Sequence, residues 1–191
     1  MDICQRTIRH ILFPLDCYRS GRSAVLRYMK EFERTQYLPS DTVQDVAFVR
    51  LQRIVNRAYE NIPYYRRTFT AAGVKPGDVR RPTDLLALPI LEKSHLQAHR
   101  DEMVDPNWPR SDLTLDRTGG STGTPVEYYR SRDRDHSRTA ATWRHNRMAG
   151  WDIGDRFAAL WGAVRDAPVA TLKQRLRNVL IDRSLMFNTA G

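Results

Sequence analysis

Apolar residues recur every three or four positions between residues 43 and 58, which is the spacing of one face of an α-helix. The face consists of Val43, Val46, Ala47, Leu51, Ile54, Val55 and Ala58. Asp41 is suited to cap the N-terminus of this helix, with Gln44 as its capping-box partner. Pro63 disfavours helical backbone at the preceding residue, so the helix is predicted to end there.

Other segments have the same helical period. Residues 1–40 are typical of one or two amphipathic helices that end at Pro39. A shorter helix is predicted over residues 65–72, because Gly73 is well suited to a left-handed C-terminal cap. Further helices are predicted over residues 83–86, 94–100, 133–148 (with Gly150 after it) and 170–181.

Four segments have the composition of strands instead. Residues 113–117 and 125–131 contain alternating or aromatic strand formers, and residues 157–161 are a short apolar run typical of a buried strand. Residues 185–187 are predicted to begin another strand. Because helices and strands alternate along the chain, the predicted fold class is α/β.

Glycine and hydroxyl residues crowd between the first two predicted strands, which places them at the tip of a hairpin. Glycines let backbone N–H groups approach an anion closely, and hydroxyls add donors that rotate to fit. Pro125 then fixes the backbone and leads into the next strand. The segment is therefore a candidate nucleotide-phosphate loop, and its residues are Thr118, Gly119, Gly120, Ser121, Thr122, Gly123 and Thr124.

This loop matches neither of the two common nucleotide motifs. It lacks the Gly-Lys-Ser/Thr ending of a Walker A loop and the G-x-G-x-x-G spacing of a dinucleotide fingerprint. An ordinary hairpin turn is the alternative, because glycine, serine and threonine dominate such turns. Ser121 also has glycines two residues before and after it, so a hydrolase nucleophile stays open if a helix comes directly after it.

The order Thr-Gly-Gly-Ser-Thr-Gly-Thr-Pro over residues 118–125 closely resembles the phosphate loop of the adenylate-forming superfamily. That superfamily usually continues with lysine, whereas Val126 stands here, which points to the phenylacetate–coenzyme A ligase family and its capsular polysaccharide branch. Three further segments resemble that family in the same order. They are the run from Leu51 to Tyr65 with its Asn-Ile-Pro-Tyr-Tyr ending, Leu88-Pro89-Ile90-Leu91-Glu92-Lys93, and Gly150-Trp151-Asp152-Ile153-Gly154-Asp155-Arg156.

The resemblance implies a reaction and a set of ligands. ATP and a small-molecule carboxylic acid would give an acyl-adenylate, and coenzyme A would then take the acyl group as a thioester. Residues 118–124 would grip the β- and γ-phosphates, and Mg²⁺ would accompany the ATP. The adenine-binding segment, the magnesium-binding glutamate, the ribose-binding aspartate and the catalytic lysine of the family have no counterpart in this sequence. No catalytic residue is therefore assigned.

The resemblance also implies how the chain is organised. Residues 1–40 would be a helical lead-in, and residues 41–191 would be an incomplete N-terminal portion of the large adenylate-forming domain. On this interpretation the 191-residue chain does not turn over substrate alone. Two alternatives stay open: adenylation chemistry in capsule or exopolysaccharide synthesis, and a nucleotide-binding module without catalysis.

Composition narrows the class of protein and the cellular compartment. The chain is 41% hydrophobic, which is ordinary for a globular protein, and it has no apolar run long enough to span a membrane. Residues 11–15 form a short apolar patch without the features of a signal peptide, so attachment of this segment to a membrane surface stays open. Cys4 and Cys17 make no disulfide framework, which favours the cytoplasm.

The chain carries a net charge of +9, and nearly all of its positive charge is arginine. The arginines are spread along the chain and interleaved with acids, and no nucleic-acid-binding motif is present. A solvated basic surface is therefore favoured over a dedicated nucleic-acid site. His95 and His99 have the spacing of a helical metal pair, but a third ligand is not evident, so an exposed helix face is favoured there too.

Overall fold

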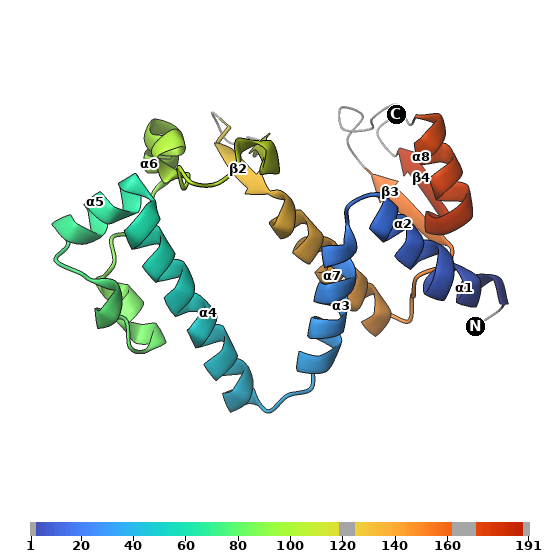
Figure 1. The fold of residues 1–191 in the computed structure, drawn as a ribbon, viewed down its shortest axis with the longest axis horizontal. Helices are drawn as coiled ribbons and strands as arrows, with labels where there is room; N and C mark the ends of the chain where they lie inside the picture. Colours follow the sequence, from blue (N-terminus) through green and yellow to red (C-terminus); the bar gives the residue numbers. More distant parts are fainter. Residues whose placement is uncertain (1–2, 119–124, 162–170, 189–191) are drawn as a thin grey trace. The chain divides into compact units, whose positions relative to one another are not determined.

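The computed structural model describes residues 3–118, 125–161 and 171–188 (Figure 1). The fold is mixed α/β, as the sequence predicted, with helices dominating and two small sheets. Two compact units make up the chain: unit 1 contains residues 1–34 and 136–191, and unit 2 contains residues 35–135. The division predicted from the sequence, into a helical lead-in of residues 1–40 and a portion of the adenylate-forming domain over residues 41–191, stays a prediction.

Unit 1 begins with a helical rod that changes its bonding pattern partway. It consists of α1 (Ile3–Thr7), the π-helical turn η1 (Ile8–Leu12) and α2 (Phe13–Arg19). Helix α3 (Ser23–Thr35) follows after Gly21, which has a positive φ of 69°. The sequence predicted one or two amphipathic helices ending at Pro39; the structure has this rod and α3, which ends at Thr35, and the π-helical turn has no signal in the sequence pattern.

The core of unit 1 joins the helical rod to segments from the second half of the chain. Helix α7 (Arg132–Met148) supplies Ala140 and Trp143, and the ring of Trp143 meets that of Phe13 edge to face at 4.6 Å. The buried members of this core are Ile8, Phe13, Cys17, Val25, Met29, Ala140 and Ile153. The helix predicted over residues 133–148 is therefore confirmed, and Gly150 after it has a φ of 89°.

Gly154 allows the segment after α7 to pass close to the helical rod. Its φ is 94°, and a Cβ at this position would lie 3.0 Å from the backbone oxygen of Gln5. Any other residue would therefore be strained and would also meet backbone. The contact fixes where the next strand begins.

Unit 1 ends in a parallel strand pair with a helical crossover, which is the smallest α/β element. Strand β3 (Phe157–Trp161) pairs with β4 (Ser184–Asn188), and Phe157 lies opposite Ser184. Helix α8 (Leu172–Arg177) begins at a capping box formed by Thr171 and Gln174 and continues as the π-helical turn η7 (Asn178–Asp182). Both predicted strands are confirmed, and the last strand has β3 as its neighbour.

Unit 2 is built on two helices joined at a proline. Helix α4 (Ser40–Asn61) ends before Pro63, and α5 (Pro63–Ala71) begins at that proline, where a missing N–H costs nothing. Gly73 has a φ of 69°, which confirms it as the left-handed residue after α5. The core of the unit is formed by Val55, Phe69 and Val79, with half-buried aromatic and leucine side chains around them.

The predicted cap of α4 is wrong by one residue. Pro39 occupies the N-cap position, so Ser40 starts the helix and Asp41 lies inside its first turn. Gln44 donates its side-chain N–H to the Ser40 hydroxyl instead of completing a capping box with Asp41. The extended backbone of Pro39 permits this earlier start, and Asp41 keeps a favourable place near the positive end of the helix.

Short elements lead from α5 to a hairpin. They are the 3₁₀ turns η2 (Pro76–Asp78) and η3 (Pro82–Ala87), helix α6 (Lys93–His99), and the 3₁₀ turns η4 (Arg100–Met103) and η5 (Arg110–Asp112). Strands β1 (Leu113–Arg117) and β2 (Glu127–Ser131) then pair antiparallel. Within the described ranges, no helix is long and apolar enough to cross a membrane.

Candidate functional site

The predicted phosphate loop connects the two strands of an antiparallel hairpin. Leu113 lies opposite Ser131 at one end of the pair, and Arg117 lies opposite Glu127 at the other. The Thr118 N–H donates to the Val126 carbonyl over 2.9 Å, and the Val126 N–H donates to the Thr118 hydroxyl over 3.0 Å. These two bonds close the neck of the hairpin, so the loop begins and ends at a fixed place.

Only one of the seven predicted loop residues lies in the described part of the chain. Thr118 is at the neck, and its hydroxyl already accepts one hydrogen bond from the backbone. A hydroxyl that accepts can still donate, so this bond leaves Thr118 able to serve a phosphate oxygen. Gly119, Gly120, Ser121, Thr122, Gly123 and Thr124 lie outside the described residues, and their role stays a prediction.

The residues after the loop bear on two expectations from the sequence. Val126, which stands where the wider superfamily has lysine, is buried at 7% exposure, so its side chain packs inward. Pro125 and Val126 lead directly into strand β2. A nucleophile elbow needs a helix directly after its serine; the residues directly after Ser121 lie outside the described part of the chain, and the strand that follows them gives the hydrolase interpretation no support.

An open cavity of about 480 Å³ lies beside the hairpin neck. Its walls come from helix α6, the adjoining turn and both ends of the loop: Leu96, Gln97, Arg100, Arg117, Pro125 and Glu127. Arg100 forms ion pairs with Glu127 and with Asp101. Arg117 is exposed, and no acidic partner for its guanidinium is found among the described residues. The cavity wall therefore keeps a net positive charge next to the predicted phosphate loop.

Charged hydrogen bonds attach the hairpin to the preceding turn. The Tyr129 hydroxyl donates to Asp101 over 3.0 Å, and the guanidinium groups of Arg100 and Arg110 lie over the Tyr129 ring at 5.7 and 5.4 Å. Hydrogen bonds from Arg100 and Tyr129 lower the pKa of Asp101 below its ordinary value. The carboxylate is therefore charged at neutral pH and holds strand β2 against η4.

A second carboxylate supports the hairpin from within. Asp116 accepts hydrogen bonds from the Arg117 backbone N–H and, over 3.2 Å, from the Tyr128 hydroxyl, and it pairs with Arg130 at 2.9 Å. The Arg117 N–H, followed by the Arg130 charge, lowers the pKa of Asp116. Both strands thus enter the loop from a framework of hydrogen bonds to ionised carboxylates.

Asp105 is the one buried carboxylate among the described residues of unit 2, and no sequence pattern pointed to it. It lies 2.8 Å from the Arg57 guanidinium and 3.2 Å from the Asn61 amide, and it accepts the Asn107 N–H. Burial alone would raise the pKa of Asp105, but these hydrogen bonds outweigh it and the pKa is lowered. Arg57 also lies over the Trp108 ring at 4.7 Å, which ties the end of α4 to this segment.

His95 and His99 both make contacts with neighbouring residues. The ring of His95 accepts the Glu92 N–H, and His99 pairs with Glu102 at 2.9 Å, while both rings face Tyr64. Across the described ranges, no group of three histidine, cysteine or acidic side chains is placed to hold a metal ion. The two histidines are half-buried contacts between α6 and α5, rather than a fully exposed face.

Sequence comparisons identify three curated relatives with the same name, and no family model matches the chain. Phenylacetate-coenzyme A ligase of Escherichia coli (strain K12) is 33% identical over 125 residues, covering 64% of this chain and 28% of the relative. The enzyme of the same name from Aromatoleum evansii is 30% identical over 141 residues, covering 69% and 30%. That of Thermus thermophilus is 35% identical over 102 residues, covering 53% and 22%.

Solved structures agree on the fold. A 2-hydroxyisobutyryl-CoA ligase in the postadenylation state, in complex with 2-HIB-AMP, matches with a TM-score of 0.59 and 20% identity. The match covers 78% of this chain and 32% of that protein. The chain spans less than a third of the length of the curated relatives it matches. Its fold is thus part of a coenzyme A ligase fold of the adenylate-forming type.

Proposed function

We propose that this chain, a sequence relative of the phenylacetate–coenzyme A ligases, is the phosphate-gripping part of an acid–coenzyme A ligase that forms AMP. The observation that carries the proposal is the loop sequence of residues 118–125 at the closed neck of the β1–β2 hairpin. The longer relatives support the view that the remaining machinery lies in further polypeptide.

In this function, the residues of the chain hold phosphates rather than react with them. A carboxylate is a poor electrophile. ATP converts it into a mixed anhydride with AMP, and AMP is then a good leaving group. Loop donors fixed in advance around the phosphates would stabilise the negative charge that shifts onto the departing pyrophosphate. Arg117, at the entrance to the loop, adds a cation. Its guanidinium has no acidic partner among the described residues, so no ion pair has to break before it meets a phosphate.

The other ligands are assigned only as far as the chain supports them. Mg²⁺ would neutralise part of the phosphate charge, but no described residues form a site for it, so none is named. Coenzyme A is the expected acceptor, and the acid is a small-molecule carboxylate. Phenylacetate and 2-hydroxyisobutyrate are the first acids to test, since the relatives are named for these acyl groups.

Binding of ATP to the purified 191-residue chain tests the loop directly. We expect ATP to bind without release of pyrophosphate, and Gly120→Val to weaken binding at least about tenfold, because a side chain blocks the approach of backbone donors. Gly77→Val is the matched control, since a Cβ at Gly77 meets no atom within 4 Å. Absence of ATP binding, or equal binding by both variants, would show that the loop is not the phosphate site.

Sequencing the coding DNA beyond codon 191 tests the rest of the proposal. If the frame continues, the longer protein is expected to exchange labelled pyrophosphate into ATP only when an acid is present. Formation of a thioester from coenzyme A would then complete the assignment. An acyl-adenylate without a thioester would favour the capsule-related alternative, and ATP binding without exchange would favour a nucleotide-binding module.

A further inference from the structure

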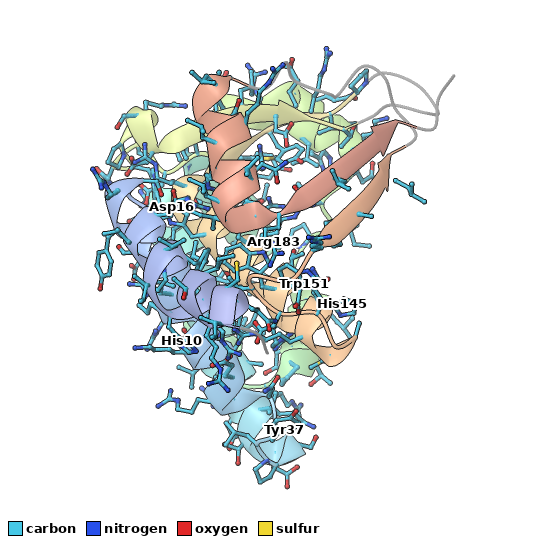
Figure 2. The ribbon with its side chains drawn as sticks, turned by 90° about the vertical axis from the view of Figure 1, so that its right-hand side faces the viewer. His10, Asp16, Tyr37, His145, Trp151 and Arg183 are labelled. Atoms are coloured by element: carbon cyan, nitrogen blue, oxygen red, sulfur yellow. The ribbon has the colours of Figure 1, made fainter. Side chains whose placement is uncertain are left out.

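The outer side of the N-terminal helical rod presents a row of exposed apolar side chains. Ile3, Ile11, Leu15 and Tyr18, here called the outer stripe, are 85, 60, 48 and 70% exposed. Ile11, Leu15 and Tyr18 follow the i, i+4, i+7 spacing, which places them on one helix face. Figure 2 labels His10 and Asp16 on the rod.

The opposite side of the same rod is already used by the core. Its buried residues are Gln5, Ile8, Phe13 and Cys17, and they pack against α3 and α7 or bond to the Asp155 loop. The core therefore does not explain the outer stripe, although single exposed apolar residues are common on any protein. Ile11, Leu15 and Tyr18 share one helix face, and Ile3 is exposed at the N-terminal end of the same rod, so the apolar residues are gathered rather than scattered.

The charges that accompany the outer stripe have one sign. Arg6 and Arg19 are exposed on the rod, whereas Arg9 is tied to Asp152. The acid on the described part of the rod, Asp16, lies on the inner side and pairs with Arg22 and Arg177. Anything that covers the stripe therefore meets apolar groups flanked by positive charge.

We propose that the outer stripe is a docking surface for an anionic lipid membrane, with the rod lying in the plane of the interface. Helices that bind in this way bury an apolar face at the boundary between headgroups and acyl chains and keep basic residues beside anionic headgroups. A nucleic acid would use the arginines but leave Ile11 and Leu15 in water. The proposal is independent of the ligase function, because it uses no residue of the hairpin.

Co-sedimentation of the full 191-residue chain with lipid vesicles tests the proposal. We expect binding to vesicles that contain phosphatidylserine and much weaker binding to phosphatidylcholine alone. Leu15→Glu should weaken binding by about tenfold or more, because a charge replaces the leucine that enters the acyl-chain boundary on binding. Arg6→Gln and Arg19→Gln should each weaken it by about fivefold.

Leu86→Glu is the matched control, because Leu86 is 89% exposed on η3 of unit 2. We expect it to bind vesicles as the unchanged chain does, and circular dichroism checks that both glutamate variants stay folded. A fluorophore on Cys4 gives a second readout, since Cys4 is exposed on the rod. Burial raises the pKa of Cys17 to about 11, which keeps its thiol unreactive during labelling.

Three results would overturn the proposal. The first is no binding to anionic vesicles, and the second is binding that Leu15→Glu and Leu86→Glu leave equally strong. The third is self-association of the chain that Leu15→Glu abolishes while vesicles are ignored, which would make the stripe a contact between two copies. A blue shift of the Cys4 fluorophore on phosphatidylserine vesicles, lost in Leu15→Glu, is the supporting result.

Discussion

The two units of the chain both contain ion pairs, such as Asp16 with Arg177 in unit 1 and Asp116 with Arg130 in unit 2, but they differ in the size of the apolar core beside them. Unit 1 has a large apolar core, in which Phe13, Val25 and Cys17 are almost fully buried, and its parallel strand pair leaves Leu160 and Leu185 exposed. Unit 2 has a smaller core and adds a network of ionised hydrogen bonds around its hairpin. We therefore expect truncation of the apolar core to cost most in unit 1, and the ion pairs of unit 2 to matter most around the hairpin that carries the predicted phosphate loop.

Truncation of a core ring in unit 1 gives the largest expected effect. Phe13→Ala should lower the free energy of unfolding by about 3–5 kcal/mol, because it removes a buried ring and leaves a cavity beside Trp143. Urea unfolding followed by circular dichroism measures the loss, with separate transitions allowed for the two units.

Ile11→Ala on the outer face of the same rod is the matched control. It should change the free energy of unfolding by no more than about 0.5 kcal/mol, because Ile11 is 60% exposed. If both variants lose the same stability, the apolar core of unit 1 does not carry its fold, and the contrast between the units fails.

Removal of one charge from unit 2 gives the next largest effect. Asp105→Asn should cost about 1–2 kcal/mol at pH 7, because the amide loses the charge-assisted bond to Arg57 and turns a donor toward Asn61. The measurement is urea unfolding from pH 3 to pH 7, and Asp45→Asn on the exposed side of α4 is the control.

The pH dependence has a definite sign. The pKa of Asp105 is lowered from 3.8 in the folded chain, so its carboxylate stabilises the fold above that value. This contribution is lost as the pH falls through the folded pKa. The gap between the unchanged chain and Asp105→Asn should therefore shrink toward pH 3. A gap that stays constant or widens would contradict the charged network as the cause.

Local sequence was sufficient for the elements of the hairpin and of α7. Alternating residues predicted β1, turn chemistry predicted the connection, and Gly73 was correctly placed as a left-handed residue. These features depend on neighbours within a few positions, and such neighbours are visible in a sequence.

The resemblance to coenzyme A ligases, carried by the loop, was confirmed by the relatives.

Contacts between distant segments were beyond prediction. Asp105 meets residues 44 and 48 positions earlier, and Arg100 reaches Glu127 on the hairpin. No spacing rule links such pairs, because their approach depends on how short 3₁₀ turns direct the chain. The π-helical turn η1 was missed because apolar spacing and helix propensity do not separate a π-helical turn from the α-helix around it.

A substitution at the neck of the hairpin gives the smallest expected effect on stability. It also tests a residue of the predicted phosphate loop. Thr118→Val keeps the shape of the side chain but removes the acceptor for the Val126 N–H, which should cost about 1 kcal/mol locally. Amide exchange at Val126 should then accelerate about fivefold. Thr118→Ser keeps the hydroxyl and should keep the protection.

ATP binding by the same two variants distinguishes two roles of Thr118, closing the hairpin and binding a phosphate. If Thr118 also donates to a phosphate, Thr118→Val weakens ATP binding and Thr118→Ser does not. Faster exchange at Val126 with unchanged ATP binding would restrict Thr118 to closing the hairpin. Unchanged exchange in Thr118→Val would mean that the backbone bond from the Thr118 N–H to Val126 is sufficient to close the neck, and that the hydroxyl is free to serve the loop.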